Sequence, residues 1–287
     1  MPGLYGYEVD EERAIATILS VFDSEINFLD TSNDYGQAER GSAPRSAPGT
    51  ACPTGSWWPP RWIPLPGDDD FSGKRVLAST AESLDRLGLD QFPLLYLHDP
   101  ERIGFEDATA AGGPFETLIA LKREGLAQNI GIASGDVELT MRFLATDTID
   151  VVLNHNRFTL IDQSALPLIE EAALRQVAFV NAAPYGGGML SKGPQQQPIY
   201  SYRPGPPTIA RRAQAMQEAC TRHGVPLAAA ALQFSLRNES IASTVVGVSR
   251  PKGFNRPLSW RAGRYPTSCG MSCARSSSRN AEYRTEA

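Results

Sequence analysis

The sequence lacks the features that mark several other classes of protein. No apolar run approaches the roughly 18–20 residues of a membrane span. The apolar stretch 14–22 follows the acidic residues Asp10, Glu11 and Glu12, so it does not resemble a signal peptide. Four cysteines in 287 residues do not suggest a disulfide scaffold, and a net charge of −5 does not suit a coat for nucleic acid or anionic membrane. These absences predict a cytoplasmic protein with no membrane and no nucleic-acid partner.

Two windows, 41–66 and 251–280, contain no Asp or Glu, although the chain has 32 acidic residues. All four tryptophans and three of the four cysteines fall in these same windows. The remainder of the chain has an ordinary mixture of apolar and charged residues. The average composition therefore combines two different kinds of segment.

Outside the windows, short apolar strands alternate with amphipathic helices. The expected strands are 26–30, 94–98, 129–134, 150–154, 177–182 and 243–247, and the expected helices are 10–23, 72–87, 115–124, 137–145, 163–175, 209–223 and 227–237. The strands are continuous apolar runs, which is typical of a parallel sheet buried on both faces. Regular alternation at this length predicts a (β/α)8 TIM barrel, and no G-x-G-x-x-G motif follows the first strand to favour an open dinucleotide-binding sheet.

Polar residues stand at the ends of the predicted strands. Asp30 and His98 end two of them, and Ser134 and Asn154 end two more. Each has an ordinary structural explanation, since an Asp before Thr-Ser also caps turns. The carboxyl ends of barrel strands converge on one rim, however, and that rim is where barrel enzymes hold their active sites. The recurrence of polar strand ends therefore predicts an active site at this rim.

Several segments resemble the aldo-keto reductase superfamily. Residues 26–39, I-N-F-L-D-T-S-N-D-Y-G-Q-A-E, closely resemble its signature of an apolar strand followed by D-T-x-x-x-Y-G-x-x-E. The other matching segments are 94–100 (L-L-Y-L-H-D-P), 131–134 (a G-x-S segment), 184–190 and 246–251 (V-G-V-S-R-P). The H-D-P feature looks most like the bacterial branch of D-threo-aldose, L-fucose and pyridoxal dehydrogenases.

The resemblance implies an NAD(P)-dependent oxidoreductase that moves hydride between nicotinamide and an aldehyde, ketone or sugar hemiacetal. It implies Tyr35 as general acid/base on the substrate oxygen and His98 as the residue that orients this oxygen. A phenol with a pKa near 10 needs a neighbouring cation to exchange protons at pH 7. In the family a lysine supplies that cation, and Asp30 matches the aspartate that holds it.

The resemblance also implies the cofactor contacts. Ser134 and Asn154 match positions near the nicotinamide carboxamide. The residues matched to the late cofactor segment, beside the adenosine phosphates, are Gly247, Ser249, Arg250 and Lys252. Arg and Lys there favour NADP over NAD; the alternative is that both cations are ordinary surface residues. No metal site is expected, because the three histidines show no ligand spacing.

The family's catalytic lysine is missing from its expected strand. The sequence at 57–63 is W-W-P-P-R-W-I, and two adjacent prolines are not expected in a central strand. Lys74 belongs to the following helix. Reading the codons two bases later permits Val-Ala-Thr-Lys-Val-Asp here, and a similar shift permits amphipathic helices in the second window. We hypothesise that both windows are translated out of frame; the alternative is a divergent Pro/Trp loop and a disordered tail.

The predicted organisation is therefore an incomplete barrel. Residues 1–250 form it, with 41–66 out of frame and the lysine strand damaged, and 251–287 are an aberrant tail. Residues 3–6 resemble the loop after the family's first strand, so that strand is expected to be absent. Two other functions stay open: a catalytically inactive barrel that binds nucleotide or a protein partner, and a barrel lyase or hydrolase. The sequence carries no signal for the oligomeric state.

Overall fold

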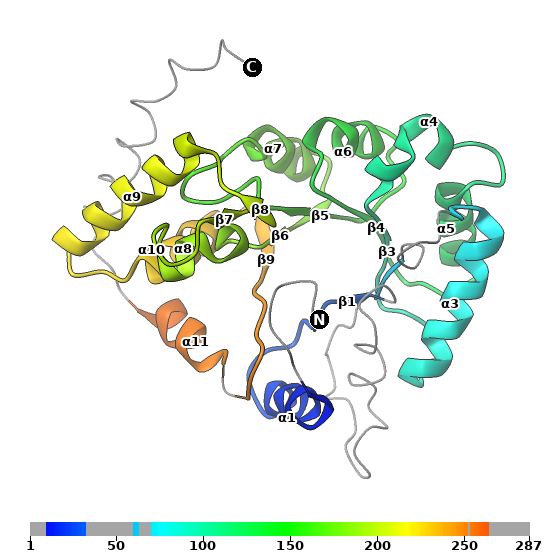
Figure 1. Cartoon of the computed structure of the whole chain (residues 1–287). Helices are drawn as coiled ribbons and strands as arrows, with labels where there is room; N and C mark the ends of the chain where they lie inside the picture. Colours follow the sequence, from blue (N-terminus) through cyan, green and yellow to red (C-terminus); the bar gives the residue numbers. More distant parts are fainter. Residues whose placement is uncertain (1–9, 33–59, 63–69, 252, 264–287) are drawn as a thin grey trace. The chain divides into compact units, whose positions relative to one another are not determined.

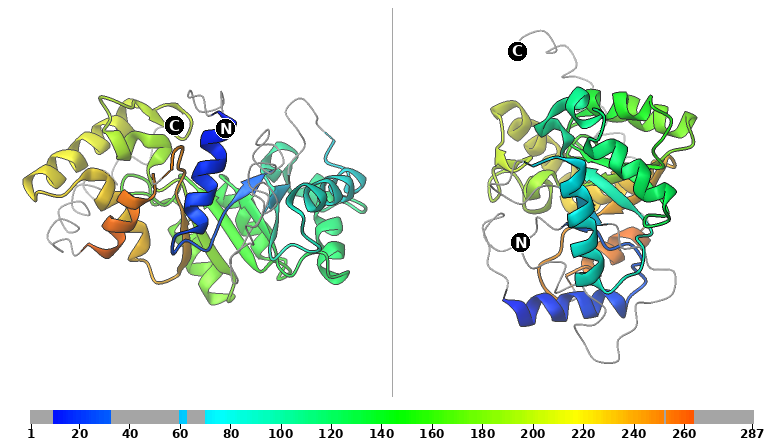
Figure 2. Two further views of the ribbon diagram at one scale, coloured as in Figure 1. Left: turned by 90° about the horizontal axis from the view of Figure 1, so that it is seen from below. Right: turned by 90° about the vertical axis from the view of Figure 1, so that its right-hand side faces the viewer.

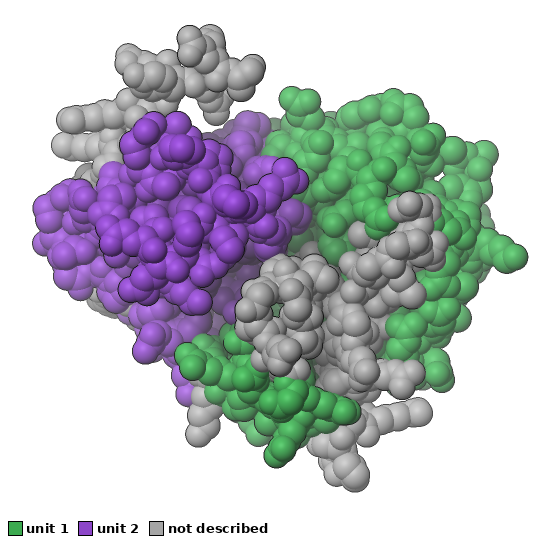
Figure 3. All heavy atoms as spheres, viewed as in Figure 1, with its two compact units in different colours: residues 1–153, 171–179, 248–254 green, residues 154–170, 180–247, 255–287 purple. Residues whose placement is uncertain are grey.

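The chain forms a sheet whose strands alternate with helices along the sequence (Figure 1). The computed structural model describes residues 10–32, 60–62, 70–251 and 253–263. Its strands follow one another in the order β1-β2-β3-β4-β5-β6-β9. The chain divides into unit 1 (1–153, 171–179 and 248–254) and unit 2 (154–170, 180–247 and 255–287), as Figure 3 shows.

The first four strands of this order pair in parallel. The seven strands are β1 Thr31–Ser32, β2 Pro60–Trp62, β3 Leu95–His98, β4 Ile130–Ser134, β5 Val151–His155, β6 Ala178–Ala182 and β9 Ile241–Val245. Tyr96 of β3 stands level with Arg61 of β2 and with Gly131 of β4. Every residue of β3 and β4 is buried, as predicted for strands covered on both faces.

Helices fill the connections between the strands. They are α1 Glu11–Phe22, α3 Gly73–Leu87, η2 Pro100–Arg102, α4 Gly104–Ala108, α5 Pro114–Arg123, α6 Val137–Leu144, α7 Leu166–Leu174, η3 Gly186–Gly188, α8 Met189–Lys192, α9 Pro207–Arg222, α10 Leu227–Leu236 and α11 Asn255–Ala262. Among the described helices, none is long and apolar enough to cross a bilayer.

The predicted helix boundaries rest on local capping. The side chain of Asp10 accepts a hydrogen bond from the Arg13 N–H at 2.7 Å, which caps α1. Ser72 does the same for α3 through the Arg75 N–H. Gly88 ends α3 with φ of 67°, a left-handed conformation that favours glycine. These caps confirm the predicted ends of both helices.

In unit 1, α3 and α5 pack side by side (Figures 1 and 2). The buried face of α3 includes Val76, Thr80 and Ser83. The spacing of apolar residues in the sequence predicts a buried stripe of Val76, Leu77, Leu84 and Leu87, and this prediction is wrong for Leu77, which is 49% exposed. It follows Val76 by one residue, and one residue rotates a helix by about 100°, away from the sheet.

In unit 2, α10 packs against α8, α9 and α11. Its buried residues include Leu227, Ala229 and Ala231. The Gln233 side-chain amide donates hydrogen bonds to the carbonyls of Trp260 and Arg261 at 2.7 and 3.0 Å, which attaches α11 to α10. Part of the window predicted to be an aberrant tail is therefore helical, while residues 264–287 lie outside the described part of the chain.

Three expected features differ from the structure. Within the predicted strand 26–30 Phe28 forms a bridge, and β1 begins after Asp30, at one end of the strand order of the described residues. The strand that the prolines were expected to damage is formed only over β2: Pro60 is its first residue, where the missing N–H is tolerated, and Pro59 lies outside the described residues. Residues 186–207, whose richness in Pro, Gly and Gln predicts a loop, contain η3, α8 and the antiparallel pair β7 Ile199–Tyr200 and β8 Arg203–Pro204.

Candidate active site

His98 lies at the carboxyl end of β3 with 5% of its surface exposed. Its Nε2 is 3.4 Å from Oδ1 of Asp99. Asp99 has φ of 46°, an uncommon conformation for a residue other than glycine. Its backbone N–H donates to the Ala133 carbonyl at 2.8 Å, so β4 fixes the turn that follows His98. Such constrained backbone is typical of functional sites.

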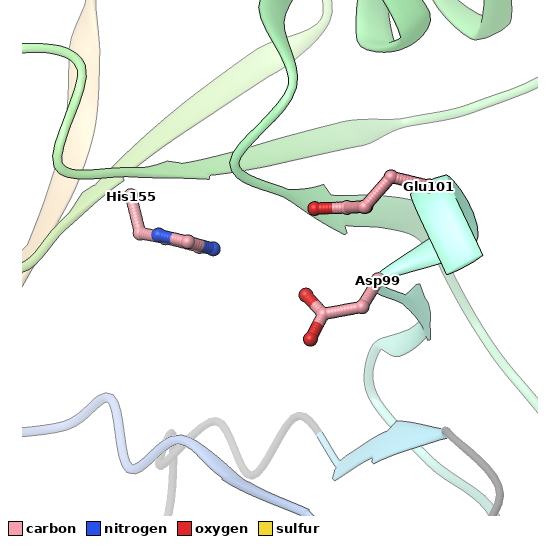
Figure 4. Close-up of side chains that lie close together, drawn as sticks. All are labelled: Asp99, Glu101 and His155. Atoms are coloured by element: carbon pink, nitrogen blue, oxygen red, sulfur yellow. The ribbon is translucent and has the colours of Figure 1, made fainter. Parts of the chain in front are cut away.

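Ser134 ends the neighbouring strand and is fully buried. His98 stands level with Ala133, the residue before Ser134. The predicted site residues His98 and Ser134 are therefore close neighbours at one end of two paired strands. The Ser134 hydroxyl donates to Oε2 of Glu101 at 2.8 Å, and the Gly135 N–H donates to Oε1 at 3.1 Å. Figure 4 shows Asp99 and Glu101 on the segment that follows β3.

Glu101 is a residue that the sequence analysis did not identify. It belongs to η2 and is exposed. It is one of 32 acidic residues, and its position three residues after His98 gave no signal. Only the pairing of β3 with β4 brings Glu101 to Ser134.

Asp30 lies immediately before β1 and is half-buried. The register places Ser32 level with Arg61 of β2. An arginine therefore stands in the strand that was expected to be damaged, and β2 contains no lysine. Lys74 lies in α3 and is exposed, in agreement with its predicted place in the helix after this strand. Tyr35 lies outside the described residues.

In unit 2, Asn154 on β5 is fully buried. The next residue but one, Asn156, has φ of 62°, and its N–H donates to the Ala182 carbonyl at 3.2 Å. His155 of β5, labelled in Figure 4, has its ring 6.0 Å from the ring of Tyr202. The carboxyl end of β5 therefore carries polar side chains, as the strand-end pattern predicts.

A buried tyrosine network was also missed by the sequence analysis. The Tyr200 hydroxyl donates to the Asn156 carbonyl at 2.8 Å and lies 3.1 Å from the Thr159 hydroxyl. Burial raises the pKa of Tyr200 and that of Tyr185 well above the ordinary value of 10.0. Both phenols therefore stay neutral at pH 7. Neither tyrosine fell at a predicted strand end, so the strand pattern could not indicate them.

The residues after β9 are more open. Gly247 and Arg250 are exposed, and Ser249 is half-buried. A Cβ at Gly247 would meet nothing within 4 Å. Arg250 accepts the Gly253 N–H through its carbonyl at 2.9 Å, which forms a turn here. Lys252 lies outside the described residues.

The described residues offer groups that suit a nicotinamide dinucleotide. In unit 1, Ser134 supplies a buried polar side chain, which suits an amide, and Arg250 supplies an exposed cation, which suits a phosphate. In unit 2, Asn154 supplies a buried polar side chain. His98 supplies an imidazole that can donate a hydrogen bond to a substrate oxygen. The residues of unit 1 alone can therefore hydrogen-bond an amide and polarise a carbonyl.

Comparison with known proteins agrees with these observations. Residues 64–259 match the family model of the aldo/keto reductase family. The chain is 36% identical over 184 residues to D-threo-aldose 1-dehydrogenase of a Pseudomonas species, covering 63% of this chain and 55% of that protein. It is 30% identical over 202 residues to pyridoxal 4-dehydrogenase of Microbacterium luteolum, covering 67% and 58%. The chain thus spans little more than half the length of these two relatives.

The solved structures give the fold. The holo form of aldo-keto reductase AKR11C1 from Bacillus halodurans has a TM-score of 0.77 to this chain at 19% identity, with 95% of this chain and 90% of that chain covered. This likeness confirms the (β/α)8 barrel fold. The two dehydrogenases confirm the predicted branch. By its family match over 64–259, the chain belongs to the aldo/keto reductase family.

Proposed function

We propose that this chain is an NAD(P)-dependent oxidoreductase that transfers hydride between nicotinamide and a carbonyl or sugar hemiacetal. The observation that carries the proposal is the placement of buried His98 beside the end of β4, where Ser134 is buried, in a chain of the aldo/keto reductase family. The relatives named as dehydrogenases of an aldose and of pyridoxal support an aldehyde or sugar substrate.

A bound nicotinamide cofactor would supply the hydride-transfer chemistry. Ser134 and Asn154 would hold the carboxamide. Gly247, Ser249, Arg250 and Lys252 would lie along the adenosine phosphates, where two cations favour NADP over NAD. No metal is needed for this reaction, and the predicted absence of a metal site and the cytoplasmic location stay predictions.

The phenol of Tyr35 would exchange a proton with the substrate oxygen as general acid/base, and His98 would orient this oxygen by a hydrogen bond. A phenol with an ordinary pKa near 10 is a weak base at pH 7 unless a cation favours its ionised form. Asp30 precedes β1, next to the strand that carries Arg61. Because β2 has no lysine, we expect slow turnover.

A second candidate follows from the same observation. A barrel without its lysine can keep the cofactor site and lose the reaction, which would leave a protein that binds nucleotide or a protein partner. The two candidates differ in turnover and agree in cofactor binding. The lyase or hydrolase alternative predicts no binding of NADPH or NADH.

The test is an NAD(P)-linked screen of aldoses, aldehydes and ketones on the full chain. The variants are Tyr35→Phe, Arg61→Lys and the matched control Arg61→Gln. We expect Arg61→Lys to raise kcat by about 10-fold or more and Tyr35→Phe to abolish it, since general acid–base catalysis contributes roughly 100-fold or more. Turnover that survives Tyr35→Phe would contradict the role of Tyr35. Cofactor binding without turnover in any variant would favour the inactive barrel.

We further propose that the windows 41–66 and 251–280 are translated out of frame, so that 41–66 interrupts a barrel of residues 1–250 and residues 251–287 form an aberrant tail. The absence of acidic residues from 41–66 and 251–280 supports this. Resequencing of the gene tests it directly. A confirmed continuous reading frame with no compensating insertions or deletions would refute it.

A further inference from the structure

The carboxylate of Glu101 joins η2 to the end of β4. Its Oε2 accepts the Ser134 hydroxyl at 2.8 Å, and its Oε1 accepts the Gly135 N–H at 3.1 Å. Both oxygens of one carboxylate therefore contact the turn that carries Ser134. All three residues belong to unit 1.

These contacts fix the direction of the Ser134 hydroxyl proton. An ionised carboxylate only accepts hydrogen bonds, and a serine has one proton to donate. The Asp136 N–H donates to the Ser134 oxygen at 2.9 Å, which agrees with a proton pointing toward Glu101. Toward any further group, the Ser134 oxygen can act only as an acceptor.

Contacts other than those of Glu101 also hold this turn. Asp136 caps α6 by accepting the Leu139 N–H at 2.9 Å. The Asp99 N–H fixes the end of β4 through the Ala133 carbonyl at 2.8 Å. These contacts lie on either side of Ser134 and do not involve the Glu101 carboxylate. Loss of this carboxylate removes the acceptor of the Gly135 N–H but leaves these contacts to hold the turn, and it allows the Ser134 hydroxyl to rotate.

We propose that Glu101 is a positioning residue that makes Ser134 a hydrogen-bond acceptor for the NH2 group of the nicotinamide carboxamide. The inference rests on the proposed function, in which Ser134 faces the carboxamide. It predicts a preference between cofactors that differ only at this group. A carboxamide offers N–H donors, whereas the acetyl group of a 3-acetylpyridine analogue offers only an oxygen, which needs a donor.

The experiment first identifies which of NADPH and NADH binds more tightly. Calorimetry then measures Kd for that cofactor and for the analogue in which an acetyl group replaces its carboxamide, and the ratio of the two Kd values is compared between variants. We expect the full chain to prefer the carboxamide form by about 10-fold, the effect of one hydrogen bond. In Glu101→Ala the hydroxyl is free to donate, so the ratio should fall to about 2-fold or less. Glu101→Gln keeps an oxygen that accepts from Ser134, and should retain most of the preference.

Two controls separate positioning from charge and from folding. Glu106→Ala removes the same charge from exposed Glu106 of α4, which pairs with Arg142 at 2.6 Å, and should leave the ratio unchanged. Ser134→Ala keeps Glu101 but removes the hydroxyl, so it should lose the preference for the carboxamide cofactor over the acetyl analogue. If Glu101→Ala does not fold, a ratio in Glu101→Gln that equals the ratio in Ser134→Ala overturns the inference.

The possible failures are distinguishable. A Glu101→Ala variant that binds cofactor with the ratio of the full chain would overturn the role of Glu101 and leave the proposed function intact. A full chain that binds neither NADPH nor NADH would overturn the proposed function, and this inference with it.

Discussion

The ammonium of Lys122 lies 2.6 Å from both carboxylate oxygens of Asp150. Asp150 also accepts the Ile130 N–H through Oδ2 at 2.9 Å, and its carbonyl accepts the Ala178 N–H. One residue thus connects α5 with the starts of β4 and β6. In barrel enzymes, residues at the starts of the strands stabilise the fold, whereas the active site lies at the carboxyl ends of the strands.

We predict that Asp150→Ala lowers the free energy of unfolding by about 2 kcal/mol and Lys122→Met by about 1 kcal/mol or less. Asp150→Ala costs more because the Ile130 N–H, in a residue that is 1% exposed, loses its acceptor. Urea unfolding of both variants measures the difference. Equal effects would show that the ion pair, and not the bond to Ile130, carries the stability.

A second prediction concerns the close approach of Tyr96 to Gly131. A Cβ on Gly131 would lie 2.8 Å from Cε1 of Tyr96 and still closer to the backbone carbonyl oxygen of Val151. Backbone cannot move aside as a flexible side chain can, so Gly131→Ala should destabilise the protein by about 2–3 kcal/mol. Gly247→Ala is the control, because its Cβ meets nothing within 4 Å. Thermal unfolding should separate the two variants clearly.

A third prediction concerns acid stability. The side-chain hydrogen bond from Arg75, helped by the charges of Arg75 and Arg86, lowers the pKa of Glu82 below its ordinary value of 4.5. A lowered folded-state pKa means that the interaction contributes above the unfolded pKa and is lost as the pH falls through the folded value.

We therefore expect Arg75→Met to lower stability by up to about 1 kcal/mol at pH 7, a modest value because the pair is partly exposed. The difference from the parent should shrink as the pH falls from about 5 to about 3. Arg123→Met, at an exposed position of α5, is the control. A difference that stays constant over this pH range would contradict the role of Glu82.

The fourth prediction concerns Asn181 in unit 2. Its side-chain N–H groups donate to the Phe158 carbonyl at 2.9 Å and to the Ser235 hydroxyl at 2.8 Å. Asn181→Ala should cost about 2–3 kcal/mol, since a buried carbonyl loses its donor. Ser235→Ala should cost about 1 kcal/mol, and the double variant less than the sum. Strict additivity in denaturant unfolding would show that the two residues do not interact.

Local signals in the sequence were sufficient for most elements. Asp10 and Ser72 cap the predicted helices, and Gly88 ends α3, because capping depends on a few neighbouring residues. The apolar runs at β3 and β4 predicted buried parallel strands for the same reason. His98 and Ser134 were predicted as strand ends because their positions follow from the ends of these runs.

Other features depend on contacts between segments that are distant in sequence. The prolines argued against a strand at 57–63, yet β2 forms at Pro60–Trp62 because β1 and β3 pair with it on either side. Leu77 is exposed because the face of α3 is chosen by what packs on it. No local pattern shows that Glu101 meets Ser134.

The sequence thus established the family resemblance, the alternation of strands and helices, and the strand ends at which His98 and Ser134 stand, because each of these is encoded in short stretches of residues. The packed structure established the partner of Ser134. Residues 101 and 134 come within 2.8 Å only after two parallel strands align, and pairing of this kind is set by burial and register across the sheet.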